Sequence, residues 1–236
     1  MSQLSQEQMA YGPDAPVAHL GAATREEFVA RTYRHVFGAI LLFTGVEIAL
    51  FTSGLAETIA GALLGVNWLL VLGGFMVVGW LASRTAHRTE SLPAQYAALA
   101  AFVVAEAILF VPLLYIANAY APGAIQSAAG VTLLGFAGLT VIGFKAGKDF
   151  SFLGSLLRWG GIVVLVAIAA AVLFGFQLGT WFSVGMVAFA GAAILYDTSQ
   201  ILHHYPRDRY VAASLELFAS VALMFWYVLR LFMSRD

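Results

Sequence analysis

Seven long apolar stretches govern what this chain of 236 residues can fold into. Each has roughly the 20 residues that a helix needs to cross the hydrocarbon layer of a bilayer. They lie at 35–54, 59–81, 95–117, 124–144, 152–175, 180–202 and 211–232. Hydrophobic residues make up 61% of the chain and charged residues only 11%, which a water-soluble domain could not bury in one core. We therefore predict an all-α integral membrane protein built as a bundle of seven transmembrane helices.

The residues before the first stretch have a different composition. The first 24 are polar and include Gly12, Pro13 and Pro16, with no basic segment leading directly into an apolar one. This pattern indicates a flexible tail rather than a cleaved signal peptide. We expect residues 1–24 to form a cytoplasmic tail and residues 25–236 to form a single seven-helix transmembrane domain.

The basic residues gather on one side of the expected bundle. Ten of the 12 Lys and Arg residues lie before the first span or in and beside the gaps between spans 2 and 3, 4 and 5, and 6 and 7. The other gaps hold none, and the remaining two, Arg230 and Arg235, are close to the C-terminus. Because positively charged loops stay in the cytoplasm, we predict a cytoplasmic N-terminus and an outside C-terminus.

Composition and motifs argue against several functions. A net charge of -1 without a basic stretch does not suit nucleic acid, and the absence of cysteine removes thiolate chemistry and Cys-ligated metals. Tyr196-Asp197 resembles half of an aspartyl intramembrane protease site, but the chain has no GxGD, GxSG or HExxH motif. The adjacent His203 and His204 point in different directions and have no third ligand at a suitable spacing, so we expect a solvated loop rather than a metal site. We expect no enzymatic activity.

Asp197 is the acidic residue that most requires an explanation. It lies in AGAAILYDTSQIL, and residues 159–196 carry no charge. A carboxylate inside the membrane costs several kcal/mol unless it is neutralised, paired or hydrated. Glu216 is expected at a similar depth in the last helix, with Ser220 one turn further along the same face. The two acids are expected to share a proton or to bind calcium through their oxygens; alternatively, Asp197 reaches water near its helix end and Glu216 makes an interhelical hydrogen bond.

Three other polar residues fall within or beside the spans. Glu106 is expected near the middle of the third span, where it is a candidate for a proton relay. Glu47 is expected near the outer boundary, where a structural role suits it better. Arg84, at the cytoplasmic end of the second span, is a candidate latch for Asp197 that protonation would break, or simply a topological anchor.

The end of the chain resembles a known family. The segment AILYDTSQI, a short basic loop and YVAASLELFASVALMFWYVLRLF are similar to the terminal signature of the Bax inhibitor-1 family, also called transmembrane Bax-inhibitor-motif proteins. The resemblance covers nearly all of the chain from Arg25 onward. Within the family, KDFSFLGSLL and the ending MSRD are most similar to the bacterial YccA-like branch.

This resemblance implies two alternative functions. Some family members are pH-sensitive calcium leaks with paired aspartates on the last two helices. The first aspartate of the pair matches Asp197. In the segment of the second aspartate this chain has Ser220, so a two-acid sensor would require Glu216 to substitute for it. The YccA-like branch is associated with restraining an FtsH-type AAA+ protease in the bacterial inner membrane, and the 24-residue tail suits such a contact. We expect a non-enzymatic regulator of that kind without a resident cofactor. A calcium leak gated by Asp197 is the alternative, with calcium as a permeant or bound ion.

Overall fold

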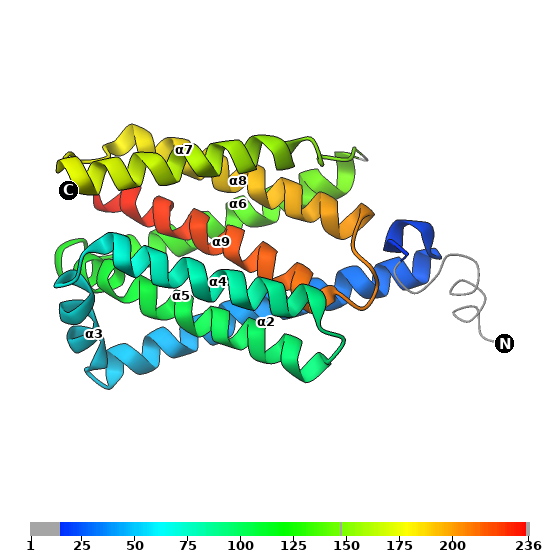
Figure 1. Cartoon of the computed structure of the whole chain (residues 1–236), viewed down its shortest axis with the longest axis horizontal. Coiled ribbons are helices and arrows are strands. Elements are labelled where there is room, and N and C mark those ends of the chain that lie inside the picture. Colours follow the sequence, from blue (N-terminus) through cyan, green and yellow to red (C-terminus); the bar gives the residue numbers. More distant parts are fainter. Residues whose placement is uncertain (1–14, 147, 235–236) are drawn as a thin grey trace.

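The computed structural model describes residues 15–146 and 148–234 and shows long helices that run side by side (Figure 1). Seven of the described helices are long and apolar enough to cross a membrane, which confirms the predicted all-α bundle. The helices begin and end as follows: η1 Val17–His19, α2 Ala22–Thr52, α3 Leu55–Leu64, α4 Trp68–Arg88, α5 Leu92–Tyr120, α6 Ala124–Ala146, α7 Leu153–Phe174, α8 Thr180–His203 and α9 Tyr210–Met233. The start of α2 and the end of α9 lie at opposite ends of the bundle (Figure 1).

The second predicted span, 59–81, is interrupted in the structure. The short helix α3 ends at Leu64, and α4 begins at Trp68. The side chain of Asn67 caps α4, because its Oδ1 accepts a hydrogen bond of 2.9 Å from the Leu69 amide. Apart from Asn67 the sequence is apolar in this region, but the backbone turns between the two helices. The predicted boundaries were therefore wrong, and α4 is the helix long enough to span.

The residues before α2 pack on the loop between α8 and α9. Val17 is fully buried, and its amide donates a 2.9 Å hydrogen bond to the carbonyl of Tyr205. Pro16 forms an isolated antiparallel bridge with Pro206. Residues 15–24, the last part of the expected tail, thus include η1 and the start of α2. Residues 1–14 lie outside the described part of the chain.

Helix α9 is at the centre of the bundle. It packs against α2, α4, α5, α6 and α8, and most of its residues are buried. Its N-terminal half contains small residues, which let neighbouring backbones approach closely where lipid provides no hydrophobic driving force between helices. Helix α7, by contrast, lies at the edge of the bundle beside α8, with Gly154 its one buried residue (Figure 1).

A glycine in α6 brings that helix close to the segment that contains Asp197. A Cβ atom added to Gly143 would lie 2.7 Å from Cγ2 of Thr198, closer than real Cβ contacts. Thr198 is fully buried, and its hydroxyl lies 3.3 Å from the hydroxyl of Tyr33 in α2. Thr198 therefore joins α8 to both α6 and α2.

Replacing this glycine tests the close approach. We expect Gly143→Ala to lower the free energy of unfolding by about 1–3 kcal/mol, because the added methyl group forces Thr198 or the backbone to move. Gly138→Ala is the matched control in the same helix, since an added Cβ there meets nothing within 4 Å. Thermal unfolding in detergent compares the two variants. Equal melting temperatures would contradict this packing.

Candidate functional site

Asp197 is bound to the central helix by a hydrogen bond. The hydroxyl of Ser220 in α9 donates to Oδ2 of Asp197 in α8, at 2.6 Å. Ser220 lies in the segment where the family resemblance implies a second aspartate. In this chain the position supplies a donor instead of a second negative charge. A hydrogen bond to a charged acceptor is among the stronger ones, and it offsets part of the cost of holding a carboxylate within the bundle.

Glu216, one turn before Ser220 on the same face of α9, is bound by α4. Its Oε1 accepts a 2.6 Å hydrogen bond from the hydroxyl of Ser83, and Nδ1 of His87 lies 3.8 Å from the same oxygen. Sequence reasoning missed both partners. Ser83 and His87 are four residues apart near the end of α4, a spacing that places them on one helix face and could have drawn attention to them.

Asp197 and Glu216 both border two cavities. The first, the bundle cavity, has a volume of about 710 Å³ and lies among α4, α5, α7, α8 and α9. The second, the loop vestibule, has a volume of about 630 Å³ and lies at the end of α8 beside the α8–α9 loop. The bundle cavity is mostly apolar, whereas His87, His204 and Arg209 line the vestibule. The two carboxylates therefore mark the boundary between an apolar interior and a polar entrance.

The other two predicted site residues lie in different places, Glu106 in the bundle cavity and Arg84 outside it. Glu106 lines the bundle cavity together with Asp197 and Glu216, and it is 6% exposed. Arg84 does not reach Asp197: its exposed guanidinium lies over the ring of Trp80, 5.1 Å from the ring centroid, and it forms no ion pair with the described residues. The structure thus offers no support for the expected latch. Arg84 is next to Ser83 in sequence, but its guanidinium contacts Trp80 of its own helix instead of a residue of α9.

Tyr205 links the vestibule to the segment before α2. Burial raises the pKa of the Tyr205 hydroxyl well above its usual range, and the carboxylates of Glu216 and Asp197 raise it further. The hydroxyl therefore keeps its proton and can donate to Nε2 of His87, at 3.2 Å. The other ring nitrogen of His87 lies 2.9 Å from the carbonyl of Ser83, which suits a proton on Nδ1. This chain of contacts orients the histidine beside Glu216.

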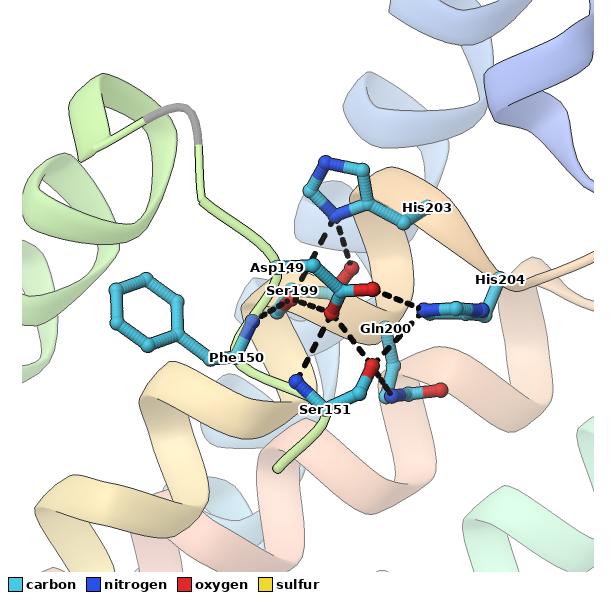
Figure 2. Close-up of polar contacts among 7 residues, drawn as sticks. All are labelled: Asp149, Phe150, Ser151, Ser199, Gln200, His203 and His204. Atoms are coloured by element: carbon cyan, nitrogen blue, oxygen red, sulfur yellow. Dashed lines mark hydrogen bonds and ion pairs between the residues drawn. The ribbon is translucent and has the colours of Figure 1, made fainter. Parts of the chain in front are cut away.

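A second polar cluster fixes the loop between α6 and α7 to the end of α8 (Figure 2). Oδ1 of Asp149 accepts hydrogen bonds from the Ser151 amide at 2.9 Å, the Ser151 hydroxyl at 2.5 Å and the Ser199 hydroxyl at 3.0 Å. Nε2 of His204 lies 2.9 Å from the other carboxylate oxygen. The Phe150 amide donates to the Ser199 hydroxyl at 2.8 Å. Since Ser199 follows Asp197 by two residues, this cluster anchors the same stretch of α8.

The cluster contains a serine, a histidine and an aspartate, but it lacks the geometry of a hydrolase. In a catalytic triad the serine and the aspartate contact different ring nitrogens of the histidine, so that a proton can be relayed. Here Ser151 and Asp149 both lie 2.9 Å from Nε2 of His204 (Figure 2). The arrangement orients a loop and does not activate the serine.

Metal ligands are sparse in the described ranges. Residues 15–146 and 148–234 contain no group of three or more His, Cys, Asp or Glu side chains that could hold an ion. His203 and His204 turn to separate partners: Nδ1 of His203 lies 2.9 Å from the Ser199 carbonyl, and His204 contacts Asp149. The side-chain oxygens that the hydrogen bonds bring together here belong to the carboxylates of Asp197 and Glu216 and to the hydroxyls of Ser220 and Ser83, and each hydroxyl already donates to one of the carboxylates.

The cluster at Asp149 predicts a response to acid. Hydrogen bonds, first from the Ser151 hydroxyl and then from His204, hold the pKa of Asp149 well below its usual range. The folded chain thus keeps this carboxylate charged at a lower pH than the unfolded chain does. The stabilisation that the charged Asp149 gives to the folded chain is complete above about pH 4, where an unfolded carboxyl group is also ionised. It is lost as the pH falls through the lower pKa that Asp149 has in the folded chain.

We expect Asp149→Asn to speed hydrogen exchange of the Phe150 amide at neutral pH, by no more than roughly fivefold because the cluster is partly exposed. We also expect the protection factor of this amide to fall in strong acid in the parent chain and to stay constant in the variant. Asp208→Asn, at an exposed position of the α8–α9 loop, is the control and should behave as the parent does. Unchanged exchange in Asp149→Asn would show that the loop is held by other contacts.

Comparisons with known proteins agree with this architecture. The family model described as "Inhibitor of apoptosis-promoting Bax1" matches residues 25–236. The chain is 37% identical over 111 residues to "Uncharacterized protein PA2604" of Pseudomonas aeruginosa, covering 46% of this chain and 49% of the relative. It is 32% identical over 97 residues to a "BI1-like protein" of Arabidopsis thaliana, covering 39% of this chain and 37% of the relative.

A further relative has a more specific name. The chain is 32% identical over 115 residues to "Modulator of FtsH protease YccA" of Escherichia coli, covering 48% of this chain and 52% of the relative. The matches span about half the length of these curated relatives or less. The match to the family model, in contrast, covers the whole helical bundle. Together with the seven apolar helices, it shows that the chain is an integral membrane protein of the Bax inhibitor-1 family.

Proposed function

We propose that this protein is a regulator in the bacterial inner membrane that binds and restrains an FtsH-type protease. The observation that carries the proposal is the similarity to the E. coli protein named as a modulator of FtsH protease, within a family match that covers the whole bundle. The name of that relative refers to modulation rather than to a reaction. The Asp149 cluster, whose serine and aspartate meet the same histidine nitrogen, also favours a non-enzymatic role.

The contact with the protease is proposed to run through the N-terminal residues. They precede η1, which packs on the α8–α9 loop through the bond from Val17 to Tyr205. Many basic residues lie at this end of the chain's helices, including Arg25 in α2 and Arg88 in α4. By the positive-inside rule this end faces the cytoplasm. A partner bound there would lie near the loop vestibule and its two carboxylates.

Deleting residues 2–14 tests this contact and keeps every residue from Ala15 onward. A longer deletion, to residue 24, would also remove Val17 and the first residues of α2, so a loss of binding would be ambiguous. We expect the shorter deletion to abolish co-purification with the FtsH-type protease while the melting temperature stays that of the parent chain. Unchanged co-purification would exclude the tail as the contact.

A pH-sensitive cation leak is the second candidate function. The position of Asp197 and Glu216, on the border of both the bundle cavity and the loop vestibule, favours it. A cation or proton that moved between the two spaces would pass these carboxylates, and Glu106 and Arg230 line the same bundle cavity. Membrane carboxylates of this kind commonly mark ion and proton pathways.

Calcium flux into liposomes tests the second function. We expect Asp197→Asn to abolish the change in flux between about pH 5 and about pH 8, because the variant cannot exchange the proton that would open or close the path. Asp208→Asn, outside both cavities, is the control and should keep the pH response of the parent chain. Identical flux for the parent and Asp197→Asn at every pH would remove Asp197 from any gate.

A further inference from the structure

A third cavity lies on the opposite side of α9 from the bundle cavity. It has a volume of about 330 Å³, and residues of α2, α5, α6 and α9 line it. Its walls include four phenylalanine rings, Phe43, Phe51, Phe218 and Phe225. The volume falls at the lower end of the range for sites that bind small molecules. We call this space the Glu47 cavity, after its acidic residue.

Two polar side chains in this cavity have no partner among the described residues. Glu47 is 7% exposed, and both of its carboxylate oxygens are buried without a hydrogen bond. Thr132, in α6, is 3% exposed, and its hydroxyl is likewise unpartnered. Both residues line the same cavity, which has no Lys, Arg or His in its wall. Groups of this kind cost free energy unless something satisfies them.

The cavity is reached from the side of the bundle. Helices α2 and α6 both pack on α9 and α5, and both contribute exposed residues to the cavity wall. Ile48 in α2 and Leu133 in α6 line the cavity and are 59% and 47% exposed. In a membrane these exposed apolar side chains face lipid. A molecule that enters here must therefore partition into the bilayer first.

These features define the chemistry of the occupant. A carboxylate and a hydroxyl, both without partners, call for a group that carries positive charge and several N–H donors. Phenylalanine faces also attract cations. An inorganic ion is a poor fit, since Ca²⁺ needs six to eight oxygens and the surrounding wall is mostly apolar. An organic ammonium satisfies Glu47 and Thr132 and fills the remaining space with its hydrocarbon part.

We infer that the Glu47 cavity binds a lipophilic primary or secondary ammonium ion that enters from the membrane between α2 and α6. The ammonium group contacts the Glu47 carboxylate and the Thr132 hydroxyl, and the apolar part packs against the phenylalanine rings. This site is separate from the Asp197 site and does not depend on the proposed function.

Radiolabelled 2-phenylethylamine is a suitable probe, because it carries a primary ammonium and a phenyl ring on a short linker. Equilibrium dialysis against the purified full-length chain in detergent measures its binding. We expect saturable binding that Glu47→Gln weakens by about tenfold or more, because the variant loses the charge while keeping the shape. Thr132→Val should weaken binding less, and Ala129→Leu should weaken it by partly filling the cavity while Glu47 stays in place.

Glu57→Gln, in α3 and outside the cavity, is the matched control and should bind as the parent does. The neutral analogue 2-phenylethanol should compete only weakly. Melting temperatures check that each variant is folded. The inference is overturned if the parent chain shows no saturable binding or if Glu47→Gln and Ala129→Leu both bind as the parent does. It is also overturned if calcium, but not the amine, binds in a manner that requires Glu47.

Discussion

The hydrogen bond from Ser220 to Asp197 joins α9, the central helix of the bundle, to α8. The acceptor, the Asp197 carboxylate, borders both the apolar bundle cavity and the polar loop vestibule, and the Ser220 hydroxyl is the donor that holds it at this boundary. Glu216, one turn away on α9, is bound in the same way by Ser83 of α4. The polar face of α9 thus connects α8 and α4 through two carboxylates, each with a hydroxyl donor from another helix.

Because α9 is central, the bundle cavity and the Glu47 cavity lie on different faces of this one helix. On one face Glu216 and Ser220 line the bundle cavity, and on another Phe218 and Phe225 line the Glu47 cavity. Five helices can pack around α9 in lipid because its small side chains let the neighbouring backbones approach closely. A shift of α9 would change the walls of both cavities together. The bundle is therefore organised around one helix rather than as a ring around an open pore.

The seven-helix bundle could be predicted from the sequence, because hydropathy indicates the number of spans. The rise per residue of a helix then gives the expected depth of each acidic residue in its span. Helical rise predicts a similar depth for Asp197 and Glu216, and in the structure both line the same two cavities. The break before α4 escaped prediction because Asn67 is one polar residue in an apolar run. His87 was missed and Arg84 was overvalued because sequence position near a helix end does not reveal which face meets α9. The partners of the acids depend on helix rotation and packing, which hydropathy does not encode.

A double-mutant cycle on Asp197 and Ser220 tests the account most directly. Asp197→Ala, Ser220→Ala and the double variant are compared with the parent chain by equilibrium unfolding in detergent. A bond of 2.6 Å to a carboxylate between two buried helix faces predicts a coupling energy of about 1–3 kcal/mol. Effects that add to within about 0.5 kcal/mol would show that the two side chains do not interact and would contradict the central role of this bond.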